Sequence, residues 1–164
     1  MSSRYLHLVR HGEATSKEQN PERPLTESGA MGVEQIAAWL ASTKLPVEQI
    51  RHTGKLRAQQ TAEIFAQHLG LTGRVTESPG LNPNDDVQPV ADSLSRETKS
   101  LMLVGHLPFM GRLVGCLVVG DPEQTIADFD AAEVVVLQRD DDGWRIVGAL
   151  SPRLLGSICC RTPQ

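Results

Sequence analysis

Residues 4–12 read Arg-Tyr-Leu-His-Leu-Val-Arg-His-Gly, a short apolar stretch that ends in a cation, an imidazole and a glycine. Side chains alternate between the two faces of a strand, and a glycine just past its end lets the backbone turn sharply or approach a ligand closely. The stretch therefore predicts a first β-strand that carries Arg10 and His11 at its carboxyl end. Ligands of open α/β sheets bind at that edge, where a guanidinium can hold a phosphate and an imidazole can attack phosphorus.

Strand-like and helix-like segments alternate along the rest of the chain, which is typical of a parallel sheet covered by helices. The expected strands are 4–9, 47–51, 74–77 and 101–105, and the expected helices are about 26–42, 55–69, 85–96 and 108–120. Near the C-terminus, 133–139 and 144–150 flank a turn and predict an antiparallel edge hairpin. The expectation is α/β: a single three-layer α/β/α domain over residues 1–164 with a mostly parallel central sheet.

The composition is that of an ordinary globular chain and argues against several classes of partner. A formal net charge of -4 disfavours an extended nucleic-acid surface, which would need an excess of basic residues. No apolar run reaches the roughly 20 residues that a membrane span requires. The first residues lead directly into the strand, without the apolar region or cleavage site of a secretory leader. We therefore expect a cytoplasmic protein with no nucleic-acid or membrane partner.

The three cysteines form neither a disulfide framework nor a pattern with metal-ligand spacing. Cys116 falls on the apolar side of the fourth expected helix and is interpreted as a small core residue. Cys159 and Cys160, adjacent near the C-terminus, would be reactive only if exposed. The cysteines therefore indicate no redox or metal chemistry.

Two further strand ends repeat the chemistry of the first. Arg57 falls in the first turn of the second expected helix, where a cation is unfavourable unless an anion is also bound. Thr53, just before this helix, offers a hydroxyl to the same anion. His106 follows the fourth expected strand, in the position that His11 has on the first. Two imidazoles and two guanidiniums at one sheet edge can surround a phosphoryl group.

Four motifs in chain order resemble those of a known family. They are Arg10-His11-Gly12-Glu13, Pro24-Leu25-Thr26-Glu27-Ser28-Gly29, Arg57-Ala58-Gln59-Gln60-Thr61-Ala62 and Gly105-His106-Leu107-Pro108. On these motifs the chain resembles the histidine phosphatase superfamily, the phosphoglycerate-mutase-like group, from about Leu6 to Leu117. The short chain, the segment 81–86 and the ending Leu150-Ser151-Pro152 are similar to the SixA-type phosphohistidine phosphatases.

The resemblance implies a phosphatase in which His11 is the nucleophile and becomes transiently phosphorylated. The implied catalytic residues are His11, Arg10, Arg57 and His106, and the implied substrate-binding residues are Arg10, Arg57, His106, Thr53, Gly12 and Leu107. The chemistry agrees, because His11 must be neutral to attack and nearby guanidiniums disfavour its protonated form. Arginines can stabilise the charge of an in-line phosphoryl transfer, so neither a metal nor another cofactor is expected.

The chain departs from the family's pattern at two places. Thr53 and Gly54 stand where members usually have serine and proline, which keeps the hydroxyl but changes the loop. Members that act on alcohol phosphates carry a carboxylate that protonates the leaving oxygen. The best candidates for it here are Asp85 and Asp86, each of which can instead cap the start of a helix.

Whether a carboxylate protonates the leaving group affects which substrate the enzyme can hydrolyse. An alkoxide leaves poorly without protonation, whereas imidazole, with a pKa of ~6.5, leaves as a neutral ring once its nitrogen is protonated. The short segment 75–100 also leaves little chain for a lid over the site. Both observations favour phosphohistidine on a protein as the substrate.

Three other interpretations are consistent with the sequence. A small-molecule phosphomonoesterase, acting on a small phosphate ester, would use the same residues and mechanism. A non-catalytic phosphate-binding module would keep the arginines without the chemistry of the histidines. A metal site would draw on His7, His11, His52 and His106, of which His7 shares a strand face with His11.

Overall fold

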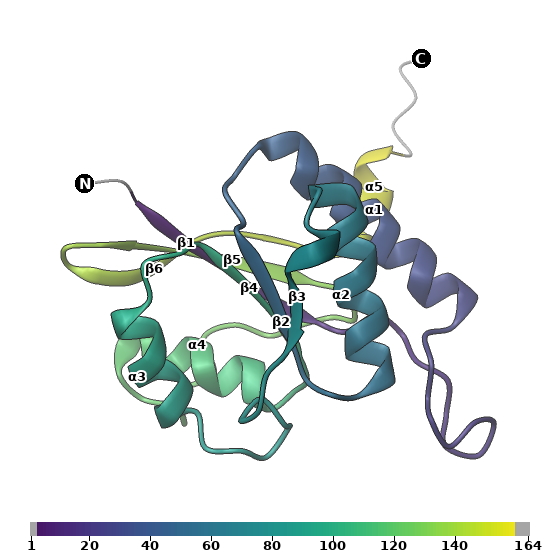
Figure 1. Cartoon of the computed structure of the whole chain (residues 1–164), viewed down its shortest axis with the longest axis horizontal. Coiled ribbons are helices and arrows are strands. Elements are labelled where there is room, and N and C mark those ends of the chain that lie inside the picture. The colour runs from purple at the N-terminus through teal and green to yellow at the C-terminus, as the bar shows by residue number, and fades with distance from the viewer. Residues whose placement is uncertain (1–2, 160–164) are drawn as a thin grey trace.

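A six-stranded sheet forms the centre of the computed structural model, which describes residues 3–159 (Figure 1). The strands are β1 (Arg4–Arg10), β2 (Gln49–His52), β3 (Val75–Glu77), β4 (Leu101–Gly105), β5 (Val134–Asp140) and β6 (Gly143–Leu150). Their order across the sheet is β3-β2-β4-β1-β5-β6. The first four in this order are parallel, whereas β5 pairs antiparallel with both β1 and β6. The expected mostly parallel sheet with an antiparallel edge hairpin is confirmed.

Helices cover both faces of the sheet, so the fold has three layers (Figure 1). They are α1 (Glu27–Thr43), α2 (Leu56–Leu69), α3 (Gln88–Arg96), α4 (Phe109–Val119) and α5 (Pro152–Cys159). Because successive strand residues face opposite ways, Val9 and Val104 pack with α1 and α2. Their neighbours Leu8 and Leu103 pack with α3 and α4. All of β4 is buried, as predicted for a strand covered on both faces.

The ends of the helices on one face follow local signals. The Thr26 side chain accepts a hydrogen bond of 2.9 Å from the Gly29 N–H and so caps the start of α1. Gly70 ends α2 in the left-handed conformation, with a φ of 70°. Both residues were predicted to mark these ends, because caps depend on contacts only three or four residues away.

The third helix begins at Gln88, three residues later than the sequence predicts. The carboxylate of Asp85 accepts a hydrogen bond of 2.9 Å from the Asn82 N–H, and that of Asp86 accepts one of 3.0 Å from the Gln88 N–H. Each side chain therefore holds a turn ahead of the helix. Local hydrogen bonds of this kind compete with helix formation at Asp residues.

Two elements have no counterpart in the sequence prediction, the 3-10 turn at Thr72–Arg74 and α5. The expected core role of Cys116 holds in part, since it is half-buried against the cluster formed with α3 and α4. Cys160 lies outside the described residues. Within residues 3–159, no helix is both long and apolar enough to cross a membrane.

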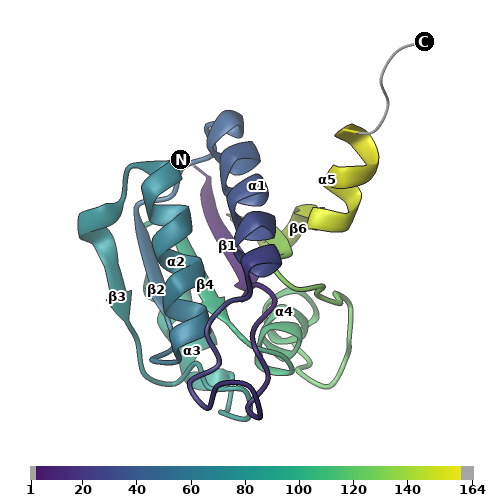
Figure 2. The same ribbon diagram turned by 90° about the vertical axis from the view of Figure 1, so that its right-hand side faces the viewer.

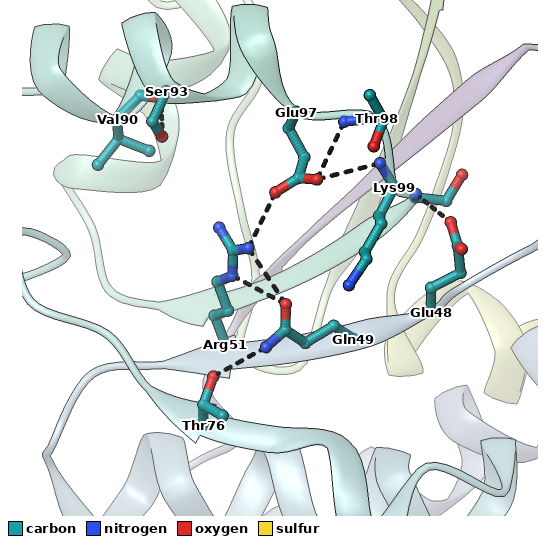
Figure 3. Close-up of polar contacts among 10 residues, drawn as sticks. Glu48, Gln49, Arg51, Thr76, Val90, Ser93, Glu97, Thr98 and Lys99 are labelled. Carbon is teal, nitrogen blue, oxygen red and sulfur yellow. Dashed lines mark hydrogen bonds and ion pairs between the residues drawn. The ribbon is translucent and has the colours of Figure 1, made fainter.

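Polar contacts tie β2 to the connection between α3 and β4 (Figure 3). The Arg51 guanidinium donates to the Glu97 carboxylate at 2.9 Å, and Glu97 also accepts from the Lys99 and Thr98 N–H groups. Burial raises the pKa of Glu97, but the hydrogen bonds from Lys99, Arg51 and Thr98 outweigh it and hold this pKa below its ordinary value. The carboxylate is therefore ionised and fastens the amino end of β4.

Candidate active site

Parallel pairing of β1 with β4 brings the two histidines together. Arg10 is aligned with Gly105, and the His11 N–H continues the ladder by donating to the Gly105 carbonyl at 3.0 Å. The next residue after β4 is His106, and the centroids of the His11 and His106 rings lie 5.0 Å apart. The structure therefore places both imidazoles at the carboxyl edge of the sheet.

Hydrogen bonds orient the His11 ring. Its Nδ1 donates to the Gly12 carbonyl at 2.7 Å, so the lone pair lies on Nε2. Arg57 Nε donates toward that lone pair at 3.4 Å. Burial lowers the pKa of His11 to about 4, the bond to Gly12 raises it in part, and the charges of Arg57, Arg10 and Arg23 lower it further. His11 is neutral at neutral pH, and its unprotonated Nε2 is the nucleophilic nitrogen.

The two predicted arginines approach from different elements. Arg10, the last residue of β1, donates from Nη1 to the Phe129 carbonyl at 2.8 Å. Its Nε is buried and has no hydrogen-bond partner among residues 3–159. Arg57 lies in the first turn of α2, and its pKa is lowered by burial and by the charge of Arg23. Buried donors without partners are costly, and an anion at this place would satisfy them.

His106 is held by a residue to which the sequence assigns a different contact. The Thr53 hydroxyl and His106 Nε2 share a hydrogen bond of 2.8 Å, and both side chains are buried. Burial lowers the pKa of His106 to about 3, and the charges of His11, Arg57, Lys55 and Arg23 act in the same direction. Thr53 therefore orients a neutral His106, whereas the sequence assigns its hydroxyl to the anion itself.

Close packing accounts for the glycines at positions 12 and 54. A Cβ on Gly12 would lie 2.7 Å from the Val33 side chain, so a larger residue would push α1 away from the chain that follows His11. A Cβ on Gly54 would lie 2.2 Å from a carboxylate oxygen of Glu77. The glycine in place of the family's proline thus makes room for this carboxylate beside the start of α2.

The structure shows no hydrogen bond or ion pair between the remaining predicted residues, all of which it describes, and the rings of His11 and His106. Leu107 is half-buried and packs against the core beside α4. Asp85 and Asp86 are engaged in the turns before α3, and neither is among the charged groups that shift the pKa of His11 or His106. The described groups that act on these two histidines by their charge are histidine or cationic side chains.

Arg23 is a residue that the sequence prediction missed. It lies in the loop between β1 and α1, and its charge lowers the pKa of His11, Arg57 and His106. The available signal was a cation directly before the Pro24-Leu25-Thr26 motif. A single loop arginine is ordinarily a solvated surface charge, so sequence alone did not single it out.

The histidines do not assemble a metal site. His7 Nε2 donates to the Pro46 carbonyl at 3.2 Å inside the sheet, and His52 Nδ1 donates to the Thr53 carbonyl. In the part of the chain that the structure describes, no group of three or more His, Cys, Asp or Glu side chains lies close enough to hold a metal ion. The interpretation as a four-histidine metal site is therefore wrong.

One surface depression lies away from the histidines and arginines. A depression of about 420 Å³ lies at the amino ends of β2 and β4, lined in part by Gln49, Thr76 and Lys99 (Figure 3). The histidines and arginines lie at the opposite, carboxyl ends of the strands. This depression is therefore separate from the candidate active site.

Known proteins share both the motifs and the fold. A family model of the histidine phosphatase superfamily (branch 1) matches residues 6–83. The phosphohistidine phosphatase SixA of Escherichia coli K12 is 30% identical over 141 residues, which cover 83% of this chain and 86% of SixA. A structure of the protein histidine phosphatase SixA complexed with tungstate has a TM-score of 0.81 at 28% identity, and the match covers 92% of this chain and 99% of that one.

More distant structures share the fold alone. A phosphoglycerate mutase from Bacillus anthracis has a TM-score of 0.72 at 11% identity, with 94% of this chain and 96% of the mutase covered. Identity at that level shows the architecture and not the activity. The similarity to SixA over most of both chains favours an enzyme over a module that only binds phosphate. The chain therefore belongs to the histidine phosphatase superfamily and is a phosphatase.

Proposed function

We propose that this phosphatase hydrolyses phosphohistidine on a protein, through a covalent phosphohistidine intermediate at His11 and without a metal. The observation that carries the proposal is the His11 ring itself. Its Nδ1 is bonded to the Gly12 carbonyl, and its Nε2 lone pair lies beside the Arg57 guanidinium. A neutral imidazole of fixed tautomer, next to cations that bind phosphate, is what nucleophilic attack on phosphorus requires.

The reaction proceeds in two transfers. His11 Nε2 attacks phosphorus in line with the substrate's P–N bond; that bond breaks, and the leaving imidazole takes a proton from water. A second water then attacks the phosphoryl group on His11 and gives up a proton, which neutralises the hydroxide left by the first transfer. The P–Nε2 bond breaks, and its electron pair returns to Nε2 while phosphate departs. Arg10 and Arg57 stabilise the charge on the phosphoryl oxygens in both steps. Neutral His106 donates its ring N–H to one of the same oxygens.

The electrostatics of the site support phosphohistidine as the substrate. The groups that act on the two histidines by their charge are themselves histidine or cationic, so this set holds no carboxylic acid that could protonate an alkoxide. Imidazole, with a pKa of ~6.5, leaves as a neutral ring after protonation by water, whereas an alkoxide gains much more from an enzymic acid. The relative SixA is by name a phosphohistidine phosphatase, which agrees with this substrate class.

Covalent labelling tests the intermediate. We expect brief incubation with a ³²P-phosphohistidine protein to give acid-labile, base-stable label on the wild-type enzyme and none on His11→Ala. His68→Ala, on the exposed side of α2, is the matched control and keeps the label. Undiminished label on His11→Ala would contradict the proposed nucleophile.

A substrate panel tests the specificity. Turnover of a phosphohistidine protein is compared with that of sugar and aryl phosphates under the same conditions. We expect a higher kcat/KM for the phosphohistidine protein, because its leaving group needs no enzymic acid. Faster turnover of the esters would assign the enzyme to small-molecule phosphomonoesters, the second candidate, with the same nucleophile.

A further inference from the structure

The loop between β1 and α1 is closed tightly at its base. Ala14 and Leu25 form an antiparallel bridge, and the Thr15 N–H donates to the Pro24 carbonyl at 2.8 Å. The Leu25 N–H also donates to the Gln60 side chain at 2.8 Å, which ties the loop to α2 one turn beyond Arg57. Figure 2 shows the loop beyond the carboxyl end of β1. Its base is therefore fastened to the elements that carry the site.

Arg23 is the residue before that base. Its Nε donates to the Thr15 carbonyl at 3.1 Å, so the guanidinium is held against the loop's own backbone. The side chain is half-buried. Among residues 3–159, no carboxylate forms an ion pair with Arg23. A half-buried guanidinium without a counter-charge is a candidate anion ligand.

The backbone at Arg23 adopts a conformation that is uncommon outside glycine. Its φ is 51°, in the left-handed region that favours glycine. Lys44 and Ala132 share this conformation for structural reasons: Lys44 ends α1, and the Ala132 N–H bonds to the Arg10 and His11 carbonyls. Arg23 likewise closes a backbone turn, since its N–H donates to the Asn20 carbonyl at 3.0 Å. A left-handed arginine at the end of this turn costs stability that a glycine there would not cost.

Arg23 also lies close to other cations. Burial and the charge of Arg23 lower the pKa of Arg57, as expected for two neighbouring cations. Burial and the charge of Arg23 also lower the pKa of His11 and the pKa of His106. Like charges gathered around a neutral imidazole are unfavourable until an anion binds between them.

From the fastened loop, the half-buried guanidinium without a counter-charge and the cations that its charge acts on, we infer that Arg23 binds the substrate's phosphoryl group as a third guanidinium beside Arg10 and Arg57. This inference rests on the proposed phosphoryl transfer and adds a residue to its binding machinery. The loop thereby supplies a phosphate contact in addition to those from β1 and α2.

Binding of inorganic phosphate and orthovanadate measures this role directly, by calorimetry below each variant's unfolding midpoint. We expect Arg23→Gln and Arg23→Gly to weaken binding about tenfold or more, since each loses charge-assisted hydrogen bonds. Arg23→Gly should have an unfolding midpoint at or above that of wild type, because glycine relieves the strain. Lys17→Gln removes a cation from the same loop and should change binding less than about twofold.

The pH dependence of kcat/KM distinguishes a role in the site from a purely structural one, because a structural role of Arg23 would leave the pH profile unchanged. Loss of the charge in Arg23→Gln should shift the acid limb to higher pH, and Arg23→Lys should restore it. Oxyanion binding equal to wild type in both Arg23→Gln and Arg23→Gly would overturn the inference. Weakened oxyanion binding, in an enzyme that does not hydrolyse phosphohistidine protein, would instead overturn the proposed substrate and leave Arg23 assigned.

Discussion

At the scale of single residues, burial has the largest influence on the chemistry of the site. It is the main cause that brings the pKa of His11 to about 4 and that of His106 to about 3. The sequence points to the arginines as the reason for a neutral nucleophile. Their charges act in the same direction, but desolvation of the ring is the larger cause.

The protonation of His11 leads to the first prediction. We expect the His11 ring, followed by NMR in the free enzyme, to titrate with a midpoint near 4 and to be neutral at higher pH. Phosphoryl transfer to His11 should therefore be lost as the pH falls through about 4. Arg57→Gln should raise the midpoint only in part, because burial remains. A wild-type midpoint at 6.5 would contradict this account.

The hydroxyl of Thr53 leads to the second prediction. Thr53→Val keeps the shape but removes the hydrogen bond to His106 Nε2. We expect kcat to fall about tenfold, the equivalent of one net hydrogen bond, with little change in KM. Thr53→Ser retains the hydroxyl and should stay near wild type. A Val variant with unchanged kcat would show that His106 needs no such orientation.

At the scale of elements, strand register brings the site together. Val104 is aligned with Val9 on one side and with His52 on the other, so the chain leaves β1, β2 and β4 at nearly the same level. His11, Thr53 and His106 each follow one of these ends. A shift of one residue in either pairing would turn a strand's side chains to the other face and separate the groups.

Helix α1 provides the third prediction, from two glycines in its first turns. A Cβ on Gly29 would lie 2.1 Å from the Glu13 carbonyl oxygen, whereas one on Gly32 would have Pro152 as its nearest neighbour at 3.4 Å. We expect Gly29→Ala to lower the free energy of unfolding by roughly 1–3 kcal/mol. Gly32→Ala should raise it by about 0.5–1 kcal/mol, because alanine favours the helix. Urea denaturation measures both, and equal effects would contradict the packing of α1 against Glu13.

At the scale of the whole molecule, the sheet encloses a titratable group that the reaction does not use. His7 lies in the middle of β1 and is fully buried, with its Nε2 bonded to the Pro46 carbonyl and its Nδ1 without a partner among the described residues. Burial lowers the pKa of His7 to about 4, although the bond to Pro46 raises it in part. The fold therefore excludes the charged form of this ring.

Acid stability provides the fourth prediction. Because the folded pKa of His7 is about 4 and the unfolded one 6.5, the unfolded chain binds more protons between these values. Stability from this group is present above pH 6.5 and lost as the pH falls toward 4, by roughly 3 kcal/mol at most. His7→Leu should make stability less dependent on pH across this window, as measured by urea denaturation. A pH dependence identical to wild type would contradict the account.

Much of the architecture follows from local sequence. The apolar strands, the Thr26 cap and the Gly70 end were predictable because they depend on periodicity and on neighbours within one turn. The strand ends that carry Arg10-His11 and His106 were predictable for the same reason. The start of α3 and the existence of α5 were not, because side-chain turns and packing on α1 decide them.

The sequence by itself thus determined the strand-end residues, and with them the kind of chemistry that the sheet edge can perform. Only the tertiary structure decided how those residues are used. It directs the Thr53 hydroxyl to His106, sets Glu77 against Gly54 and brings the charge of Arg23 to bear on His11. These contacts join residues from separate strands and loops, so strand register and loop closure, which no local pattern encodes, decide them.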